Sequence, residues 1–177
     1  MPPYTTTDLH DRIERSASCD CTQCVLACKS MPGYLVPGDI ERIAEFMGVD
    51  PDNEDFLADN FRASEGPLLL EAATGKTYRI PTIVPAQYDD NGRCVFLAEG
   101  DRCMIHQVSP YGCSRFRVCD HPSREADVRS KMGLQAITAS LDYTMLWMWL
   151  WQRGLRSPSL ADRKRRLQEL LDEDEGK

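Results

Sequence analysis

Apolar residues recur at helical spacing in several stretches of the chain, and these stretches predict most of its secondary structure. The clearest helix is expected between Pro37 and Gly48. Its apolar residues are Ile40, Ile43, Ala44 and Met47. A second helical segment is expected to start at Asp50-Pro51 and to include Phe61, and a short helix is expected over about residues 5–16.

A β-hairpin is predicted in the middle of the chain. Residues 77–84 are rich in β-branched residues and tyrosine, although Pro81 and Pro85 restrict them to an edge strand or an irregular one. The Asn-Gly turn within residues 89–92 then leads to a returning strand over residues 93–97. A second turn at residues 99–101 places Cys94 and Cys103 on or beside this small β unit.

The C-terminal part is expected to hold two helices. The first runs from beyond Pro122 to about Gly154, and the second starts at Ser159, which forms a capping box with Asp162. The first helix carries a stripe of apolar residues at helical spacing, namely Leu134, Ile137, Leu141, Met145 and Met148. A membrane span is not expected, because polar residues interrupt the apolar run that a span needs.

Charge and length narrow the function classes. The net charge of −7 and the pI near 5.0 argue against nucleic acid and anionic membranes as main partners. The N-terminus lacks the positive start and apolar run of a signal peptide, so we expect a cytoplasmic protein. Its 177 residues fit a single domain.

The chain's eight cysteines fall into two groups, and the first group crowds four of them into ten residues. The cysteines are Cys19, Cys21, Cys24, Cys28, Cys94, Cys103, Cys113 and Cys119. In a reducing cytoplasm such clustered thiols are expected to be metal ligands rather than disulfide partners. Thiolates are soft ligands, so they favour zinc, copper(I) or an iron-sulfur cluster over magnesium or calcium.

Several arrangements of these ligands stay open from the residues alone. The Cys94–Cys103 and Cys103–Cys113 spacings are too long for a zinc knuckle, and the thiols suffice for one shared site or for two. Turn formers after Cys28 predict that the first group lies in a loop with at most one helical turn. We interpret His106 and His121 as surface histidines rather than nitrogen ligands.

Motifs around six of the cysteines follow one another in a specific order. They are Cys21-Thr22-Gln23-Cys24, Cys28, Val36 to Ile43, Cys94-Val95-Phe96-Leu97, Cys103-Met104-Ile105, and Pro110-Tyr111-Gly112-Cys113 with Phe116. Over about residues 19–119 this pattern resembles the YkgJ-type cysteine cluster family, whose members are described as zinc- or iron-chelating and are often labelled as containing an iron-sulfur cluster. The resemblance implies that the six cysteines share one metal, with a [4Fe-4S] cluster favoured over Zn²⁺.

The chain departs from the family pattern at several positions. Ala27 stands where the family has the first cysteine of a pair, so one expected ligand is missing. Cys19 or Cys119, both additional to the pattern, is the candidate to replace that ligand. Arg115 and Arg117 are candidates to neutralise the negative charge of a thiolate cluster.

These inferences predict an α+β fold, mainly α, in which a small metal-stapled cysteine-rich module with a short β-hairpin precedes two C-terminal helices. We expect one domain over residues 1–177, with the metal-binding module at about 19–119 and the helical part at about 123–174. The leading function is metal binding with a redox or accessory role. Longer proteins of the family resemble a flagellin lysine methylase, so a cluster-dependent protein-modifying enzyme is one alternative, although no catalytic residues are identified.

A third alternative is a zinc-stapled structural protein that binds a partner. Trp147, Trp149 and Trp151 alternate in sequence and therefore point to different sides of a helix. One side would need a partner protein or a second copy of the chain, unless the domain wraps the helix completely.

Overall fold

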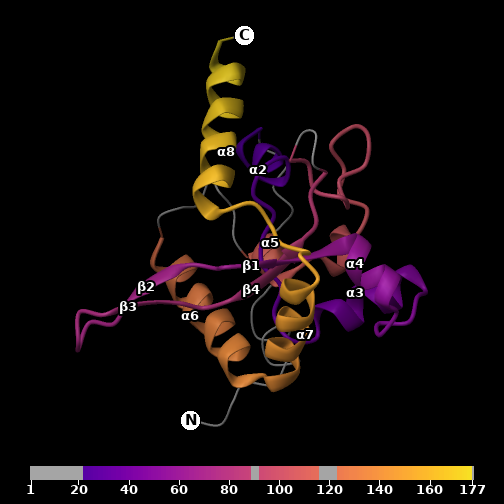
Figure 1. The fold of residues 1–177 in the computed structure, drawn as a ribbon. Coiled ribbons are helices and arrows are strands. Elements are labelled where there is room, and N and C mark those ends of the chain that lie inside the picture. The colour runs from indigo at the N-terminus through magenta and orange to yellow at the C-terminus, as the bar shows by residue number, and fades with distance from the viewer. Residues whose placement is uncertain (1–21, 89–91, 116–122, 177) are drawn as a thin grey trace.

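The structure is a computed structural model that describes residues 22–88, 92–115 and 123–176 (Figure 1). Helices predominate in these segments, which confirms the predicted α+β, mainly α, fold class. The helices are α2 (Thr22–Cys28), α3 (Asp39–Met47), α4 (Glu54–Asn60), the 3-10 helix η1 (His106–Val108), α5 (Tyr111–Arg115), α6 (Arg124–Ala139), α7 (Leu141–Gln152) and α8 (Leu160–Glu175). The helix predicted over residues 5–16 lies outside the described residues.

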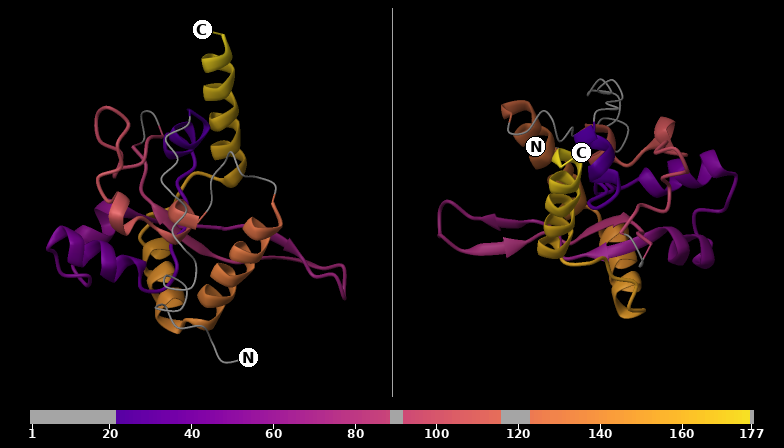
Figure 2. Two further views of the ribbon diagram at one scale, coloured as in Figure 1. Left: turned by 180° about the vertical axis from the view of Figure 1, so that it is seen from behind. Right: turned by 90° about the horizontal axis from the view of Figure 1, so that it is seen from above.

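Two antiparallel strand pairs occur in the described segments. β1 (Phe61–Ser64) pairs with β4 (Thr82–Pro85), with Phe61 opposite Pro85. β2 (Leu68–Leu70) pairs with β3 (Thr77–Arg79) and forms a hairpin that projects from the body of the molecule (Figures 1 and 2). A short hairpin is therefore present, as the sequence predicts.

The predicted position of the hairpin was wrong. Residues 77–84 do not pair along their length with residues 93–97, because all of β4 is buried and pairs instead with β1. Pairing with residues 93–97 begins only beyond residue 84, at the bridge between Gln87 and Cys94, where Tyr88 N donates to Arg93 O and Val95 N donates to Ala86 O, both at 2.9 Å. The chain after Cys94 closes a tight turn, in which Leu97 N donates to Cys94 O at 3.0 Å, so it cannot continue as a strand.

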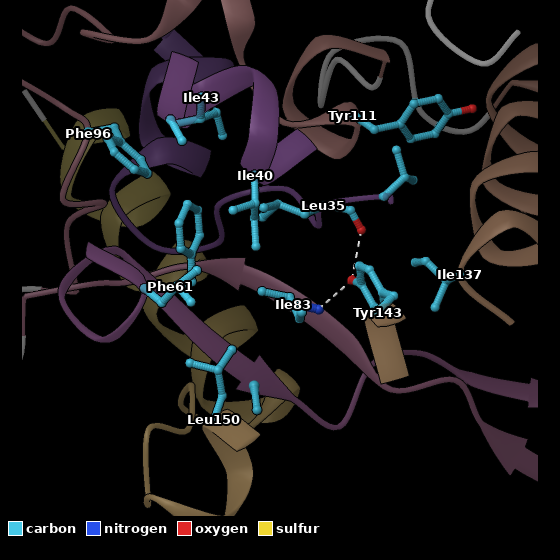
Figure 3. Close-up of a cluster of buried hydrophobic side chains, with 14 of the residues drawn as sticks. Leu35, Ile40, Ile43, Phe61, Ile83, Phe96, Tyr111, Ile137, Tyr143 and Leu150 are labelled. Atoms are coloured by element: carbon cyan, nitrogen blue, oxygen red, sulfur yellow. Dashed lines mark hydrogen bonds between the residues drawn. The ribbon is translucent and has the colours of Figure 1, made fainter. Parts of the chain in front are cut away.

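The apolar core lies between the β1–β4 pair and the helices around it, and Tyr143 joins three of its parts (Figure 3). The Tyr143 hydroxyl donates to Leu35 O at 2.8 Å and accepts from Ile83 N at 2.6 Å. Leu35 N in turn donates to Ile83 O at 2.8 Å. The segment that leads into α3 is thereby fixed to β4 and α7 by buried hydrogen bonds, each of which would be costly to leave unmade.

Helix α3 matches its prediction closely. It buries Ile40, Ile43 and Ala44, and it ends at Gly48, whose φ of 71° is the left-handed conformation that glycine adopts without strain. Helix α4 begins later than predicted, after Asn53, whose side chain accepts from Phe56 N. Phe61, which was expected to belong to that helix, is instead the first residue of β1.

The single helix predicted from Pro122 to Gly154 is in fact two helices, α6 and α7. They are separated at Ser140, which has extended φ and ψ values of −103° and 114°. Its side chain caps α7 by accepting from Tyr143 N at 3.2 Å. A serine that bonds to the backbone two or three residues on offers an alternative to a continuous helix. The capping box that starts α8 is confirmed, since Ser159 Oγ accepts from Asp162 N at 3.1 Å.

The tryptophans of α7 are half-buried rather than fully presented to solvent. Trp147 stacks on Trp151 with 4.9 Å between the ring centroids, and its Nε1 donates to Ser64 O on β1 at 2.9 Å. Arg153 lies over the Trp149 ring. In the part of the chain that the structure describes, none of the helices combines the length and apolar character that crossing a membrane requires.

Candidate metal centre

Five of the predicted cysteine ligands lie in the described residues, and none of these five forms a disulfide. They are Cys24, Cys28, Cys94, Cys103 and Cys113. Cys19, Cys21 and Cys119 lie outside the described residues, as do His121 and Arg117. The site is therefore built below from the five that the structure places.

The first cysteine group continues into a helix, and the prediction of a loop with at most one helical turn was wrong. Helix α2 extends over seven residues from Thr22 to Cys28. Nothing in this segment breaks a helix, because the next proline and glycine along the chain come only after it, at Pro32 and Gly33. Cys24 and Cys28 are four positions apart, so they lie on the same face of α2, with Leu26 buried between them in sequence.

Backbone hydrogen bonds join the end of α2 to the second cysteine group. Cys94 N donates to Cys28 O at 3.1 Å, which brings residues 66 positions apart in sequence side by side. Cys103 pairs with Leu97 through an isolated β-bridge, and Leu97 N bonds back to Cys94 O. The loop between the two cysteines thus folds on itself and keeps both of them close to α2.

A close crossing of two glycines positions Cys113. Gly112 N donates to Tyr34 O at 2.8 Å, and Gly33 N donates to Cys113 Sγ at 3.2 Å. A Cβ atom on Gly33 would lie 2.2 Å from the carbonyl carbon of Gly112, so the two backbones touch and only glycine fits. An N–H that points at sulfur favours the negatively charged thiolate over the thiol.

A buried carboxylate fixes the start of α5, which carries Cys113. Asp39 Oδ2 accepts from Val36 N and Tyr111 N, both at 2.9 Å, and Asp39 Oδ1 accepts from Arg42 at 2.7 Å. Asp39 is fully buried. These bonds hold α5 against the start of α3, because a buried charge that lost its partners would be strongly unfavourable.

The thiols of four cysteines influence one another electrostatically. Burial, followed by the negative charges of Cys103 and Cys24, raises the pKa of Cys28 to about 11. Burial, followed by the charges of Cys28 and Cys103, raises the pKa of Cys94 to about 12. The pKa of Cys113 is raised well above its ordinary value by burial and then by Cys28, Cys94 and Cys103.

Cys28 of the first group, whose carbonyl accepts from Cys94 N, thus lies within electrostatic reach of three cysteines of the second group. Without a cation these thiols hold their protons at neutral pH, because several thiolate charges would otherwise share a poorly solvated space. Within the described residues, no three Cys, His, Asp or Glu side chains are already spaced as the ligands of one ion. The two findings agree, since charges act over longer distances than metal–ligand bonds.

The remaining predicted residues lie at the edge of the site or inside the fold. His106 is exposed on η1, which confirms its interpretation as a surface histidine. Arg115 is 2% exposed on α5, two residues after Cys113, where its charge lowers the otherwise raised pKa of Tyr111. Ala27 lies half-buried on α2, one position before Cys28.

Comparison with known proteins gives one match. Residues 20–132 match the family CxxCxxCC, described as "Putative zinc- or iron-chelating domain". The match covers more than half of the chain and confirms the resemblance drawn from the cysteine motifs. No curated protein and no solved structure matches the chain.

Proposed function

We propose, since the chain belongs to the CxxCxxCC family of zinc- or iron-chelating domains, that it binds one metal centre through cysteines of both groups. The observation that carries this proposal is the backbone hydrogen bond of 3.1 Å from Cys94 N to Cys28 O, around which four thiols from distant parts of the chain raise one another's pKa. They are Cys28, Cys94, Cys103 and Cys113. A metal bound only by cysteines of the first group would not require Cys28 to lie next to the second group.

The donor set fits the metals that the family name gives. Four thiolates satisfy tetrahedral zinc, and they equally satisfy a [4Fe-4S] cluster. Cys21 and Cys24 are the other two cysteines of the six-cysteine family pattern and are alternative ligands, because either centre takes only four, and Cys19 or Cys119 is the candidate to replace the ligand missing at Ala27. Between the two metals we favour the [4Fe-4S] cluster, on the resemblance to proteins labelled as iron-sulfur-containing.

The metal would supply either a structural staple or a one-electron redox centre, and the chain would supply its ligands and surroundings. The Gly33 N–H at the sulfur of Cys113 is a donor of the kind that adjusts cluster potentials. We further propose that the cysteine-rich module and the C-terminal helices form one domain. The packing of α6 on α5, of α7 on β1 and of α8 on α2 supports this.

Anaerobic purification of the full chain tests the proposal. We expect a coloured protein with broad visible absorption, iron and acid-labile sulfide. A colourless protein with stoichiometric zinc would keep metal binding and reject the cluster, and a protein that takes up neither metal would reject both.

A cysteine variant with a matched neighbour tests the ligand set. Cys103→Ser is expected to weaken metal binding by more than about tenfold, because the loss of a residue that only hydrogen-bonds to a metal ligand commonly lowers metal affinity about tenfold or more. Met104→Ser, on the exposed next residue, serves as the control for changes in the same loop. Equal metal content in the two variants would exclude Cys103 as a ligand.

A further inference from the structure

Three charged side chains form one ion-pair cluster beside the cysteines. Lys29 Nζ lies 2.7 Å from Asp101 Oδ2, and Arg93 Nη2 lies 3.7 Å from Asp101 Oδ1. Each of the three belongs to a different cysteine-bearing segment. Lys29 directly follows Cys28, and Arg93 directly precedes Cys94. Asp101 lies two positions before Cys103.

Asp101 occupies an unusual backbone conformation at this point. Its φ of 60° is the one positive value at a non-glycine position in residues 22–88, 92–115 and 123–176. Aspartate tolerates the left-handed region better than most residues, but the conformation is still unfavourable. Such an unfavourable conformation persists only where the surrounding structure enforces it, and residues in such conformations concentrate at functional sites.

Arg93 links the same cluster to the loop that carries Cys103. Its Nε donates to Leu97 O at 3.1 Å, and its Nη2 donates to Ala98 O. The Arg93 guanidinium therefore bonds to backbone carbonyls in the middle of the loop between Cys94 and Cys103, and it also pairs with Asp101 near the end of that loop. One carboxylate thus meets the cations of two other segments.

Stability alone does not explain this cluster. The side chain of Lys29 is 29% exposed, that of Asp101 36% and that of Arg93 26%. Ion pairs with this much solvent exposure add little to the free energy of folding. What the cluster does instead is restrict the relative positions of three cysteine-bearing segments. A metal site requires this restriction, because its ligands must converge from distant parts of the chain.

We propose that Asp101, held by Lys29 and Arg93, is a positioning residue that aligns the segments of Cys28, Cys94 and Cys103 for metal binding. This inference rests on the proposed function and assigns residues outside the ligand set. Asp101 contacts no metal in this role and acts through the segments that it joins.

A purely electrostatic effect of Asp101 would have the opposite sign. Burial and the charges of Cys103 and Cys24 are the larger causes of the raised pKa of Cys28, and the Asp101 carboxylate raises it further. The Asp101 charge therefore disfavours the Cys28 thiolate. Removal of that charge alone should therefore tighten metal binding. Removal of a positioning contact should weaken it, so the direction of the change separates the two roles.

The test measures Zn²⁺ affinity of the full-length reduced protein by competition with a chromophoric chelator, and the Co²⁺ spectrum as a record of ligand geometry. Asp101→Asn keeps the side-chain shape and the tolerance for positive φ. Lys29→Met and the double variant complete a cycle with it. Glu54→Gln is the matched control, because Glu54 lies 3.3 Å from Arg153 and also joins distant segments, but away from the cysteines.

We expect Asp101→Asn to lower Zn²⁺ affinity about tenfold and to alter the Co²⁺ spectrum, as loss of groups behind metal ligands commonly does. The effects of Asp101→Asn and Lys29→Met should be less than additive in affinity, whereas the metal-free unfolding midpoint should change no more than in Glu54→Gln. Tighter or unchanged binding by Asp101→Asn would overturn the positioning role alone. Failure of the unmodified protein to bind Zn²⁺, Co²⁺ or iron would overturn the proposed function and the positioning role together.

Discussion

Single residues fix the position of Cys113 more strictly than the cysteine motif itself does. The absence of side chains at Gly33 and Gly112 lets two backbone segments touch, and the sulfur of Cys113 accepts a hydrogen bond from Gly33 N. No periodicity predicts such a contact, because a glycine in sequence looks the same whether it serves a turn or a crossing. The sequence motif Pro110-Tyr111-Gly112-Cys113 indicated a site but not the reason for its glycine.

Gly112→Ala separates this steric requirement from helix propensity. Propensity alone favours alanine in α5 by up to about 1 kcal/mol. The added Cβ would lie 2.4 Å from the backbone N of Tyr34, and overpacking of this kind costs roughly 1–3 kcal/mol. We therefore expect a net loss in the free energy of unfolding, measured by urea denaturation, together with weaker metal binding.

Gly176→Ala is the control for that experiment. Gly176 also has a negative φ, of −83°, and its nearest neighbour to a new Cβ is 3.6 Å away, an ordinary contact. A Gly112→Ala protein as stable as this control would show that the Gly33–Gly112 crossing is looser than the structure has it.

At the scale of elements, sequence patterns predicted those that depend on local signals. Helix α3 follows from its apolar spacing and Gly48, and α8 follows from the Ser159 capping box. The pairing of β1 with β4 could not be predicted, because it depends on burial of β4 from both sides rather than on a turn between neighbouring strands. The turn signal before Gly92 accordingly closes only a short contact, in which Tyr88 N donates to Arg93 O at 2.9 Å, while β4 pairs with β1.

The separation of α6 from α7 rests on the cap at Ser140 and gives a second prediction. Ser140→Ala removes the acceptor for Tyr143 N and should lower the free energy of unfolding by about 1 kcal/mol. Thr138→Ala is the matched control, since Thr138 is exposed two residues earlier and only bonds back to Gln135 O. If urea denaturation gives the two variants the same stability, the Ser140 cap does not stabilise the start of α7.

At the scale of the whole molecule, the order of the cysteines predicts that the two groups lie together. The family pattern implied that Cys28 lies with Cys94, Cys103 and Cys113, and the structure places these four within electrostatic reach of one another. The Lys29–Asp101–Arg93 cluster had no sequence signal, because its members are ordinary charged residues 64 and 8 positions apart along the chain. Only the fold brings them together.

The buried thiols also predict how the stability of the metal-free protein depends on pH. The pKa of Cys28 rises from 9.0 to about 11 and that of Cys94 from 9.0 to about 12, chiefly through burial. A group whose pKa is higher in the folded state keeps its full stabilising effect below the unfolded value and loses it as the pH rises through the folded value. The metal-free protein should therefore lose stability from about pH 9 to pH 12.

Metal binding should remove the cysteine part of this loss, because bound thiolates have already released their protons. Tyr111, whose pKa burial raises to about 12, should still contribute in both forms. Urea denaturation across this pH range, on metal-free and metal-loaded protein, measures the difference. Parallel pH profiles for the two forms would mean that the buried thiols do not hold the metal.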